Sequence, residues 1–268
     1  MIKLIAVDLD GTLLKDDNKI SVKTKEVIKR VADLGIYVIL ATGRPYKVTS
    51  EIQKELGIDH PMILHNGAIV KSFSGQLTYS KPISIKKVKE FVDYCNEKEY
   101  TCSIIFNDCE EIYMNKVDYF TYGIHVNCNN TIPIVRKKLE ELPTKPITKI
   151  LVTDKNSRFI SEANEDLLKK FSTELNILKS GNWYIDIANK DISKGIVLKY
   201  IAESLKISPK NIMAIGDSRN DVGMLEYANV SVAMGNAEDF VKERADYVTL
   251  SNNDDGVYEA IKKFINVS

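Results

Sequence analysis

Two aspartates, Asp8 and Asp10, stand at the end of the first apolar run of the chain and are followed by Gly11 and Thr12. If this run is a strand, side chains two positions apart project to the same side of it. Two neighbouring carboxylates repel each other unless a proton or a cation lies between them. A hard cation such as Mg²⁺ prefers oxygen ligands, and Gly11 lets the loop turn and present N–H groups to an anion. The alternative is an ordinary acidic turn after a strand.

Thr42, Gly43 and Arg44 form a second polar group, between an apolar run at 36–41 and a helix predicted to begin near Pro45. The N–H groups and the dipole at a helix N-terminus favour phosphate, and Thr42 adds a hydroxyl donor. An ordinary capped turn is the alternative interpretation.

Lys194 stands at the start of a helix predicted over 193–205. A cation is unfavourable at this end of a helix dipole, so an anion nearby would explain its position. A solvated lysine is the alternative.

Residues 216–221 again join an apolar strand to a helix. Asp217 can supply an oxygen to a metal, and Asn220 can donate to a phosphate. Ser218 and Asp221 also match the S-x-x-D pattern of a capping box, which gives Asp221 a structural explanation.

These four groups are placed by a regular alternation of strands and helices in the first and last thirds of the chain. This alternation is typical of an α/β fold with a doubly wound parallel sheet. Ligands of such sheets bind outside the carboxyl ends of the strands, so we expect the groups to meet there.

The middle of the chain has a different pattern and predicts an inserted α+β module. Its helices are expected at 84–99, 133–142 and 161–174, and its strands at 102–106, 112–114, 147–152, 177–179 and 183–187. We therefore predict a core domain formed by residues 1–82 and 187–268, interrupted by a second domain at 83–186.

The composition excludes few classes of protein and is ordinary for a globular protein. The 268 residues include 37 basic and 37 acidic side chains, so the net charge is zero, which argues against nucleic-acid and membrane partners. No apolar run reaches the ~18 residues that span a bilayer, and we expect a cytoplasmic protein. The four cysteines, Cys95, Cys102, Cys109 and Cys128, are expected to be reduced and structural.

The quoted motifs resemble those of the haloacid dehalogenase-like hydrolase superfamily, and in particular its Cof-type sugar-phosphatase branch. The matching segments are DLDGT (8–12), ATGR (41–44), SKG (193–195), GDSRND (216–221) and NGA (66–68). The resemblance covers essentially the whole chain. It implies a Rossmann-like core with the middle module as its cap, and Mg²⁺ as the cofactor.

The resemblance also implies a role for each matching residue. Asp8 would be the nucleophile and a metal ligand, and Asp10 the general acid and base, with its backbone carbonyl on the metal. Asp217 would complete the protein's metal ligands, with Asp221 supporting it nearby. The phosphoryl oxygens would be held by Thr42, Gly43, Lys194, Asn220 and the backbone of Leu9, while Arg44 and Asn66 would face the substrate beneath the cap.

We therefore predict a phosphatase that hydrolyses a small phosphorylated metabolite through an aspartyl-phosphate on Asp8. A phosphomutase or phosphotransferase with the same site is one alternative, because only the acceptor differs. A phospho-accepting signalling module is another, but it needs no inserted domain. The substrate and the oligomeric state are not predicted. His125 is expected to be exposed or hydrogen-bonded, with a substrate contact as the alternative.

Overall fold

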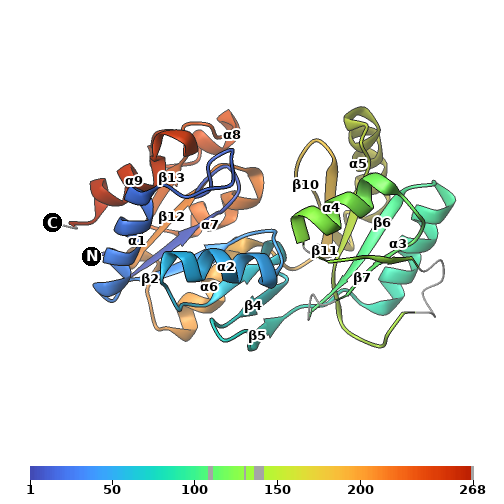
Figure 1. Ribbon diagram of the computed structural model, residues 1–268, viewed down its shortest axis with the longest axis horizontal. Coiled ribbons are helices and arrows are strands. Elements are labelled where there is room, and N and C mark those ends of the chain that lie inside the picture. Colours follow the sequence, from blue (N-terminus) through green and yellow to red (C-terminus); the bar gives the residue numbers. More distant parts are fainter. Residues whose placement is uncertain (108–110, 130, 136–141, 267–268) are drawn as a thin grey trace. The chain divides into compact units, whose positions relative to one another are not determined.

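The computed structural model describes residues 1–107, 111–129, 131–135 and 142–266. The chain forms two compact units. The first consists of Met1–Gly43, Thr49–Thr78 and Ser193–Ser268, and the second of Arg44–Val48 and Tyr79–Ile192. Figure 1 shows that the first unit takes its strands from both ends of the chain, coloured blue and orange to red. The domain limits at 82/83 and 186/187 remain a prediction, and the units divide four to six residues from them.

The first unit contains a sheet with the strand order β14-β13-β12-β1-β2-β3-β4-β5. The pairs from β14 to β3 are parallel, and β3 pairs with β4 antiparallel. Its strands are β1 (Leu4–Val7), β2 (Tyr37–Ala41), β3 (Met62–Leu64), β4 (Ile69–Lys71), β5 (Leu77–Ser80), β12 (Ile212–Gly216), β13 (Val230–Ala233) and β14 (Tyr247–Val248). β1 lies at the centre and is buried throughout, which explains why it reads as an apolar run.

Helices connect these strands, as the alternation predicts. They are α1 (Val22–Asp33), α2 (Tyr46–Leu56), α6 (Lys194–Ser204), α7 (Val222–Tyr227), α8 (Asp239–Lys242) and α9 (Gly256–Phe264). Short 3₁₀ turns lie at η1 (His65–Gly67), η3 (Pro209–Asn211), η4 (Arg219–Asp221) and η5 (Asn252–Asp254). Ser21 caps α1 by accepting a hydrogen bond from the N–H of Thr24.

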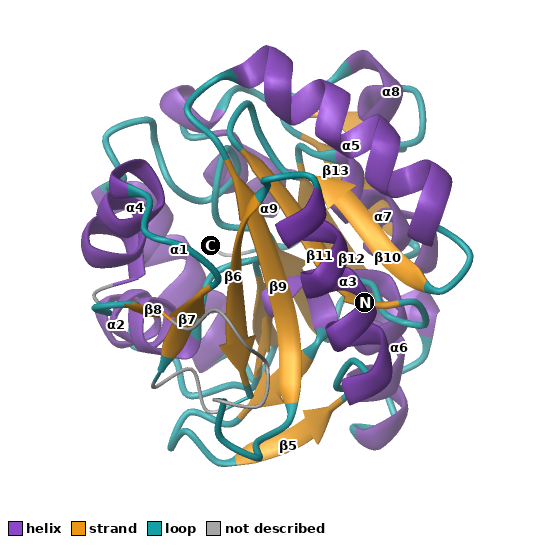
Figure 2. Cartoon of the chain, turned by 90° about the vertical axis from the view of Figure 1, so that its right-hand side faces the viewer, coloured by secondary structure: helices purple, strands orange, loops and turns teal. Residues whose placement is uncertain are grey.

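The second unit is an antiparallel sheet packed against helices (Figure 2), with the order β10-β11-β9-β6-β7-β8. Only the β7–β8 pair is parallel among those described. The strands are β6 (Thr101–Phe106), β7 (Ile112–Met114), β8 (Ile134–Val135), β9 (Ile147–Thr153), β10 (Leu175–Lys179) and β11 (Tyr184–Asn189). The helices are α3 (Ile85–Glu97), α4 (Tyr119–Asn129) and α5 (Ser157–Phe171). Phe91 and Phe171 join α3 to α5, with ring centroids 5.2 Å apart.

The structure corrects the sequence prediction at two places in this unit. The helix expected at 133–142 is wrong at its beginning, which forms β8, and 136–141 lie outside the described residues. Helix α4 was not predicted. Cys95 and Cys102 are buried free thiols, as predicted; Cys109 and the side chain of Cys128 lie outside the described residues. Within the described part of the chain, every helix is too short or too polar to cross a membrane.

Candidate active site

Lys194 is buried between two carboxylates. Asp8 directly follows β1, and the Lys194 Nζ lies 2.5 Å from its Oδ1. The same Nζ lies 2.6 Å from Asp221 Oδ1. Lys194 is the first residue of α6, and Ser193 caps this helix by accepting from the N–H of Ile196. The structure thus supplies the anions that the position of Lys194 at a helix start requires.

Asp217 and Asp221 are fixed by hydrogen bonds from their own loop. Asp221 Oδ2 accepts from the backbone N–H groups of Asp217 and Ser218, each at 3.0 Å, and the predicted capping box of Ser218 and Asp221 is present. Asp217 accepts from the Thr12 hydroxyl at 2.9 Å and from the Ser218 hydroxyl at 3.1 Å. Asp217 is therefore tied to the loop that follows β1.

Asp8, Asp217 and Asp221 form one group of carboxylates. One oxygen from each lies within 4.8 Å of the others, and no other such group of acidic, histidine or cysteine ligands occurs among the residues described. With all three carboxylates ionised, these side chains and Lys194 would carry three negative charges and one positive charge. The two excess negative charges, in a mostly buried position, match a hard divalent cation with oxygen ligands.

The pKa values in this group reflect the excess of negative charge. Burial and the Asp221 carboxylate raise the pKa of Asp8 well above 3.8, although Lys194 acts in the opposite direction. Burial and Asp221 also raise the pKa of Asp217, to about 6. Burial alone would lower the pKa of Lys194, but the carboxylates of Asp221 and Asp8 outweigh it and raise this pKa. The lysine therefore stays charged.

A glycine allows the loop after β1 to approach Asp217. Gly11 has a φ of +77°, which favours glycine, and a Cβ at this position would lie 2.4 Å from Asp217 Oδ2. No side chain fits between this loop and the carboxylate. The glycine of the first motif is thus required by both backbone conformation and space.

Asp8 and Asp10 both follow the last residue of β1, so the pairing of their carboxylates stays a prediction. Strand β1 ends at Val7, and the alternation of side chains along a strand does not continue through the following loop. Asp8 is buried, whereas Asp10 is exposed and its backbone forms an isolated bridge with Leu14. The acidic group around Asp8 contains Asp217 and Asp221.

The loops after β2, β3 and β12 are joined by amide groups. The Asn66 N–H donates to the carbonyl of Thr42 at 2.9 Å, and Asn220 Nδ2 donates to Asn66 Oδ1 at 3.0 Å. A Cβ on Gly43 would lie 3.2 Å from the Asn66 amide. Asn66 has a left-handed backbone with a φ of 56°, and such strain is concentrated at functional sites. Four predicted residues, Thr42, Gly43, Asn66 and Asn220, thus lie together.

Leu9 and Arg44 complete the predicted set. The Leu9 side chain is fully buried, and its carbonyl accepts from the N–H groups of Leu14 and Thr12 at 2.8 and 3.3 Å. Arg44 is half-buried between β2 and α2, in a segment that groups with the second unit. From the sequence, Thr12 had no predicted role and Ser218 only a place in the capping box, although the hydroxyls of both donate to Asp217.

The fold and this site define the class of protein. Residues 5–261 match the haloacid dehalogenase-like hydrolase family, and the chain belongs to it. Two relatives from Bacillus subtilis are named 5-amino-6-(5-phospho-D-ribitylamino)uracil phosphatases, YcsE and YitU. Each is 30% identical over 98% of this chain, covering 96% and 98% of the relative.

Solved structures agree with this assignment. TM0651 of Thermotoga maritima has a TM-score of 0.85 and 30% identity, covering 99% of this chain and 98% of that one. The sugar phosphatase BT4131, described as a subclass IIB member, has a TM-score of 0.83 and 26% identity over 98% of each chain. The family and the named relatives make this chain a phosphoric monoester hydrolase.

Proposed function

We propose that this chain is a Mg²⁺-dependent phosphatase that transfers the phosphoryl group of a small metabolite to Asp8 and then to water. The observation that carries the proposal is the buried group of Asp8, Asp217 and Asp221 around Lys194, with two uncompensated negative charges. A structural salt bridge needs no such excess, because an unbalanced buried charge destabilises the fold.

The metal would be held by the carboxylates of Asp8 and Asp217 and by the backbone carbonyl of Asp10, with Asp221 supporting it. When bound, Mg²⁺ supplies positive charge that keeps Asp8 ionised beside an anionic substrate. The hydroxyls of Thr12 and Ser218 orient Asp217 for this task, because a carboxylate fixed by hydrogen bonds binds a metal in one defined orientation.

The chain's own residues account for two successive phosphoryl transfers. A carboxylate oxygen of Asp8 forms a bond to phosphorus while the bond to the ester oxygen breaks, and Asp10 donates a proton to that leaving oxygen. Asp10 then takes a proton from water, whose oxygen attacks phosphorus and releases Asp8 and inorganic phosphate. Lys194 compensates the charge of the phosphoryl oxygens during both steps.

The phosphoryl oxygens would be bound by the loops that the structure joins. The hydroxyl of Thr42, the backbone of Gly43 and Leu9, and the amide of Asn220 supply donors without a charge. Asn66 and Arg44 would contact the rest of the substrate. The hydrogen bond between Asn220 and Asn66 supports a shared role for the two amides.

The relatives support a substrate class for this chain. YcsE and YitU are named for a substrate that carries its phosphate on a ribityl chain, and BT4131 is a sugar phosphatase. These substrates share a phosphomonoester on a polyhydroxylated carbon chain. We propose the same class here.

Phosphate release with and without Mg²⁺, across sugar and polyol phosphates, tests this proposal. We expect metal-dependent multiple turnover that EDTA abolishes, and turnover near background for Asp8→Asn with the fold intact by circular dichroism. Free inorganic phosphate as the product separates hydrolysis from transfer to a second metabolite. Normal turnover by Asp8→Asn would exclude the nucleophile assigned here.

A further inference from the structure

Two asparagines from the C-terminal part of the chain hold the loop that follows β1. Asn236, which follows β13, donates from Nδ2 to the carbonyl of Gly11 at 2.8 Å. Asn252, the first residue of η5, donates from Nδ2 to the carbonyl of Leu14 at 3.0 Å. Neither asparagine belongs to the motifs that predicted the site, yet both reach the loop that carries Asp10.

The two asparagines act as one unit. The N–H of Asn252 donates to Asn236 Oδ1 at 2.9 Å, so the side chain of Asn236 is held at both ends. Asn252 is only 6% exposed, and its Nδ2 also donates to Asp16 Oδ1 at 3.1 Å. A buried amide with both of its donor contacts made has one defined orientation.

The segment that carries Asn252 is itself held in place by hydrogen bonds and close packing. The N–H of Gly235 donates to the carbonyl of Leu250 at 2.9 Å, and a Cβ on Gly256 would lie 2.1 Å from the same carbonyl oxygen. The Thr249 hydroxyl donates to the carbonyl of Gly256 at 2.8 Å. Close packing on several sides leaves this segment little room to move.

The two carbonyls that the asparagines hold belong to residues that follow Asp10 in the loop. Gly11 follows Asp10 directly, and Leu14 forms the isolated bridge with Asp10. The N–H of Leu14 in turn donates to the carbonyl of Leu9 at 2.8 Å. Fixing Gly11 and Leu14 therefore fixes the backbone of Asp10, whose side chain lies outside the buried acidic group.

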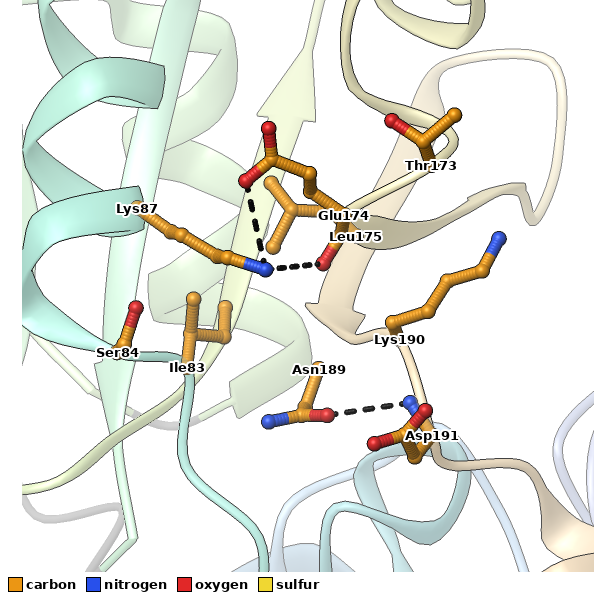
Figure 3. Close-up of a pocket in the computed structure, with 9 residues that line it drawn as sticks. All are labelled: Ile83, Ser84, Lys87, Thr173, Glu174, Leu175, Asn189, Lys190 and Asp191. Atoms are coloured by element: carbon orange, nitrogen blue, oxygen red, sulfur yellow. Dashed lines mark hydrogen bonds and ion pairs between the residues drawn. The ribbon is translucent and has the colours of Figure 1, made fainter.

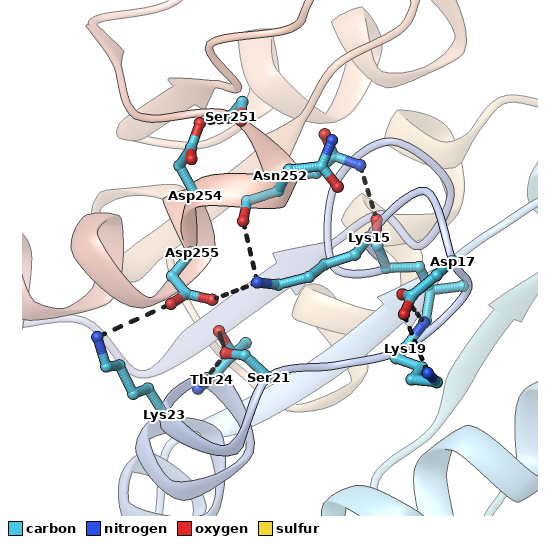
Figure 4. A network of polar contacts seen from close by, with 12 residues as sticks. Lys15, Asp17, Lys19, Ser21, Lys23, Thr24, Ser251, Asn252, Asp254 and Asp255 are labelled. Atoms are coloured by element: carbon cyan, nitrogen blue, oxygen red, sulfur yellow. Dashed lines mark hydrogen bonds and ion pairs between the residues drawn. The ribbon is translucent and has the colours of Figure 1, made fainter.

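Lys15, further along the loop, also contacts the C-terminal segment that carries Asn252. Figure 4 shows Lys15 reaching Asp255, at 3.4 Å from Oδ1. Lys15 Nζ also donates to the carbonyl of Asn253 at 2.9 Å. This outer contact is partly exposed, so it adds less than the buried Asn252.

We propose that Asn252, together with Asn236, is a positioning residue that holds Asp10 where it can protonate the leaving oxygen. The inference rests on the proposed function, in which Asp10 is the general acid. The asparagines act through the carbonyls of Leu14 and Gly11. A misplacement of about 1 Å can cost on the order of 100-fold in rate, so such a support matters for Asp10.

The leaving group of the substrate separates this role from a merely structural one. The nitrophenolate of p-nitrophenyl phosphate leaves without a proton, whereas the alkoxide of glycerol phosphate needs one. The ratio kcat/KM covers only the steps up to transfer to Asp8, so it isolates leaving-group protonation from the later attack by water. We expect Asn252→Ala to lower kcat/KM for glycerol phosphate by about 10-fold or more, and to change that for p-nitrophenyl phosphate little.

Two further variants make the test decisive. Asn236→Ala removes a side chain that is exposed rather than buried, and we expect the same selective loss if Asn252→Ala fails to fold. Asn115 in the second unit is a matched control, since it is buried and donates to Asn96 Oδ1 and to the carbonyl of Tyr100. Asn115→Ala should lower the melting temperature without changing the ratio between the two substrates.

Equal losses of kcat/KM for both substrates, or none, in Asn252→Ala and Asn236→Ala would overturn the positioning role. That result is distinguishable from failure of the proposed function. Failure of the proposed function would appear as undiminished turnover in Asp8→Asn, whatever the effect of the asparagine variants.

Discussion

Lys194 Nζ lies 2.5 Å from Asp8 Oδ1, although 186 positions separate the two residues in the chain. β1 and β12 are parallel neighbours, paired from Leu4 with Ile212 to Val7 with Ile215, and this pairing brings the loops of Asp8 and Asp221 to the same edge of the sheet. Lys194 enters from α6 and joins them. The lysine therefore has a structural task besides the catalytic one proposed for it, because each carboxylate would otherwise be buried beside like charge.

Lys194→Met should destabilise the protein as well as inactivate it. Removing one partner of a buried ion pair costs about 3–5 kcal/mol, because a charge is left without compensation. Adding Asp221→Asn should restore part of this free energy of unfolding, measured by urea denaturation. Lys199→Met on the same helix is the control: its contact with Glu203 is long and exposed, so it should cost less than about 0.5 kcal/mol. Equal effects of both lysine variants would show that Lys194 is not a compensating charge.

Mg²⁺ should stabilise the protein even without substrate. Binding to the folded state alone adds about 2.7 kcal/mol at 100 times the dissociation constant, which calorimetry detects as a higher melting temperature. Asp217→Asn should abolish most of this increment. Asp246→Asn is the matched control, because Asp246 accepts from the N–H and hydroxyl of Ser231 outside the acidic group. A full Mg²⁺ increment in Asp217→Asn would remove Asp217 from the metal ligands.

Most of the core could be predicted because its strands are buried on both faces and their loops carry short motifs. Apolar runs at β1, β2 and β12 are unambiguous signals, and parallel pairing places their carboxyl ends together. The capping box of Ser218 and Asp221 is likewise a local pattern, and the structure contains it. Local rules suffice where one segment sets its own conformation.

Contacts between distant segments could not be predicted in the same way. The strand rule does not place Asp10, because β1 ends at Val7, and only the fold shows that Asp221 joins Asp8. Helix α4 has aromatic and β-branched residues and a glycine, which lower helix propensity. Its start depends on Asp118, whose carboxylate accepts from the N–H and hydroxyl of Thr121.

A polar pocket in the second unit likewise depends on a contact between distant segments that the sequence does not predict. A pocket lies between α3 and the segment after β11, and Lys87 and Glu174 both line it (Figure 3). The Lys87 Nζ lies 3.1 Å from the backbone carbonyl of Glu174 and 3.4 Å from its Oε2. No sequence motif marks these residues, since the contact joins positions 87 apart. The lysine is already satisfied there, so the pocket needs no ligand to explain it.

Gly195→Ala should disrupt the contact between α6 and α7. A Cβ on Gly195 would lie 2.3 Å from the backbone carbonyl of Gly223, and overpacking of this kind costs about 1–3 kcal/mol. We also expect reduced turnover, because Lys194 precedes Gly195 and would shift with the helix. Unfolding in urea and phosphate release measure the two effects.

Gly223→Ala is the control, because Gly223 lies on α7, on the other side of the contact between α6 and α7. Its Cβ would come no closer than 3.5 Å to Ser193 Oγ, an ordinary van der Waals distance. Alanine favours a helix over glycine by about 1 kcal/mol, so this variant should be neutral or more stable. An equal loss of stability in Gly223→Ala and Gly195→Ala would show that the contact between α6 and α7 is not tighter at Gly195 than at Gly223.

His125 should make the second unit less stable in mild acid. It is fully buried on α4, and its Nε2 lies 2.7 Å from Ser103 Oγ, which confirms the expectation of a hydrogen-bonded histidine. Burial and the nearby positive charge of Lys149 lower its pKa from 6.5 to about 4. The unfolded chain therefore binds a proton between these pH values that the folded chain does not.

The free energy of unfolding should consequently rise with pH from about 4 to about 6.5, by roughly 3 kcal/mol in total from this residue. The contribution is complete above the unfolded pKa and is lost as pH falls toward the folded value. His125→Gln should flatten this part of the pH profile, measured by urea denaturation, because glutamine can bond Ser103 but does not titrate. An unchanged slope in His125→Gln would show that other groups cause the acid sensitivity, and that folding does not lower the pKa of His125.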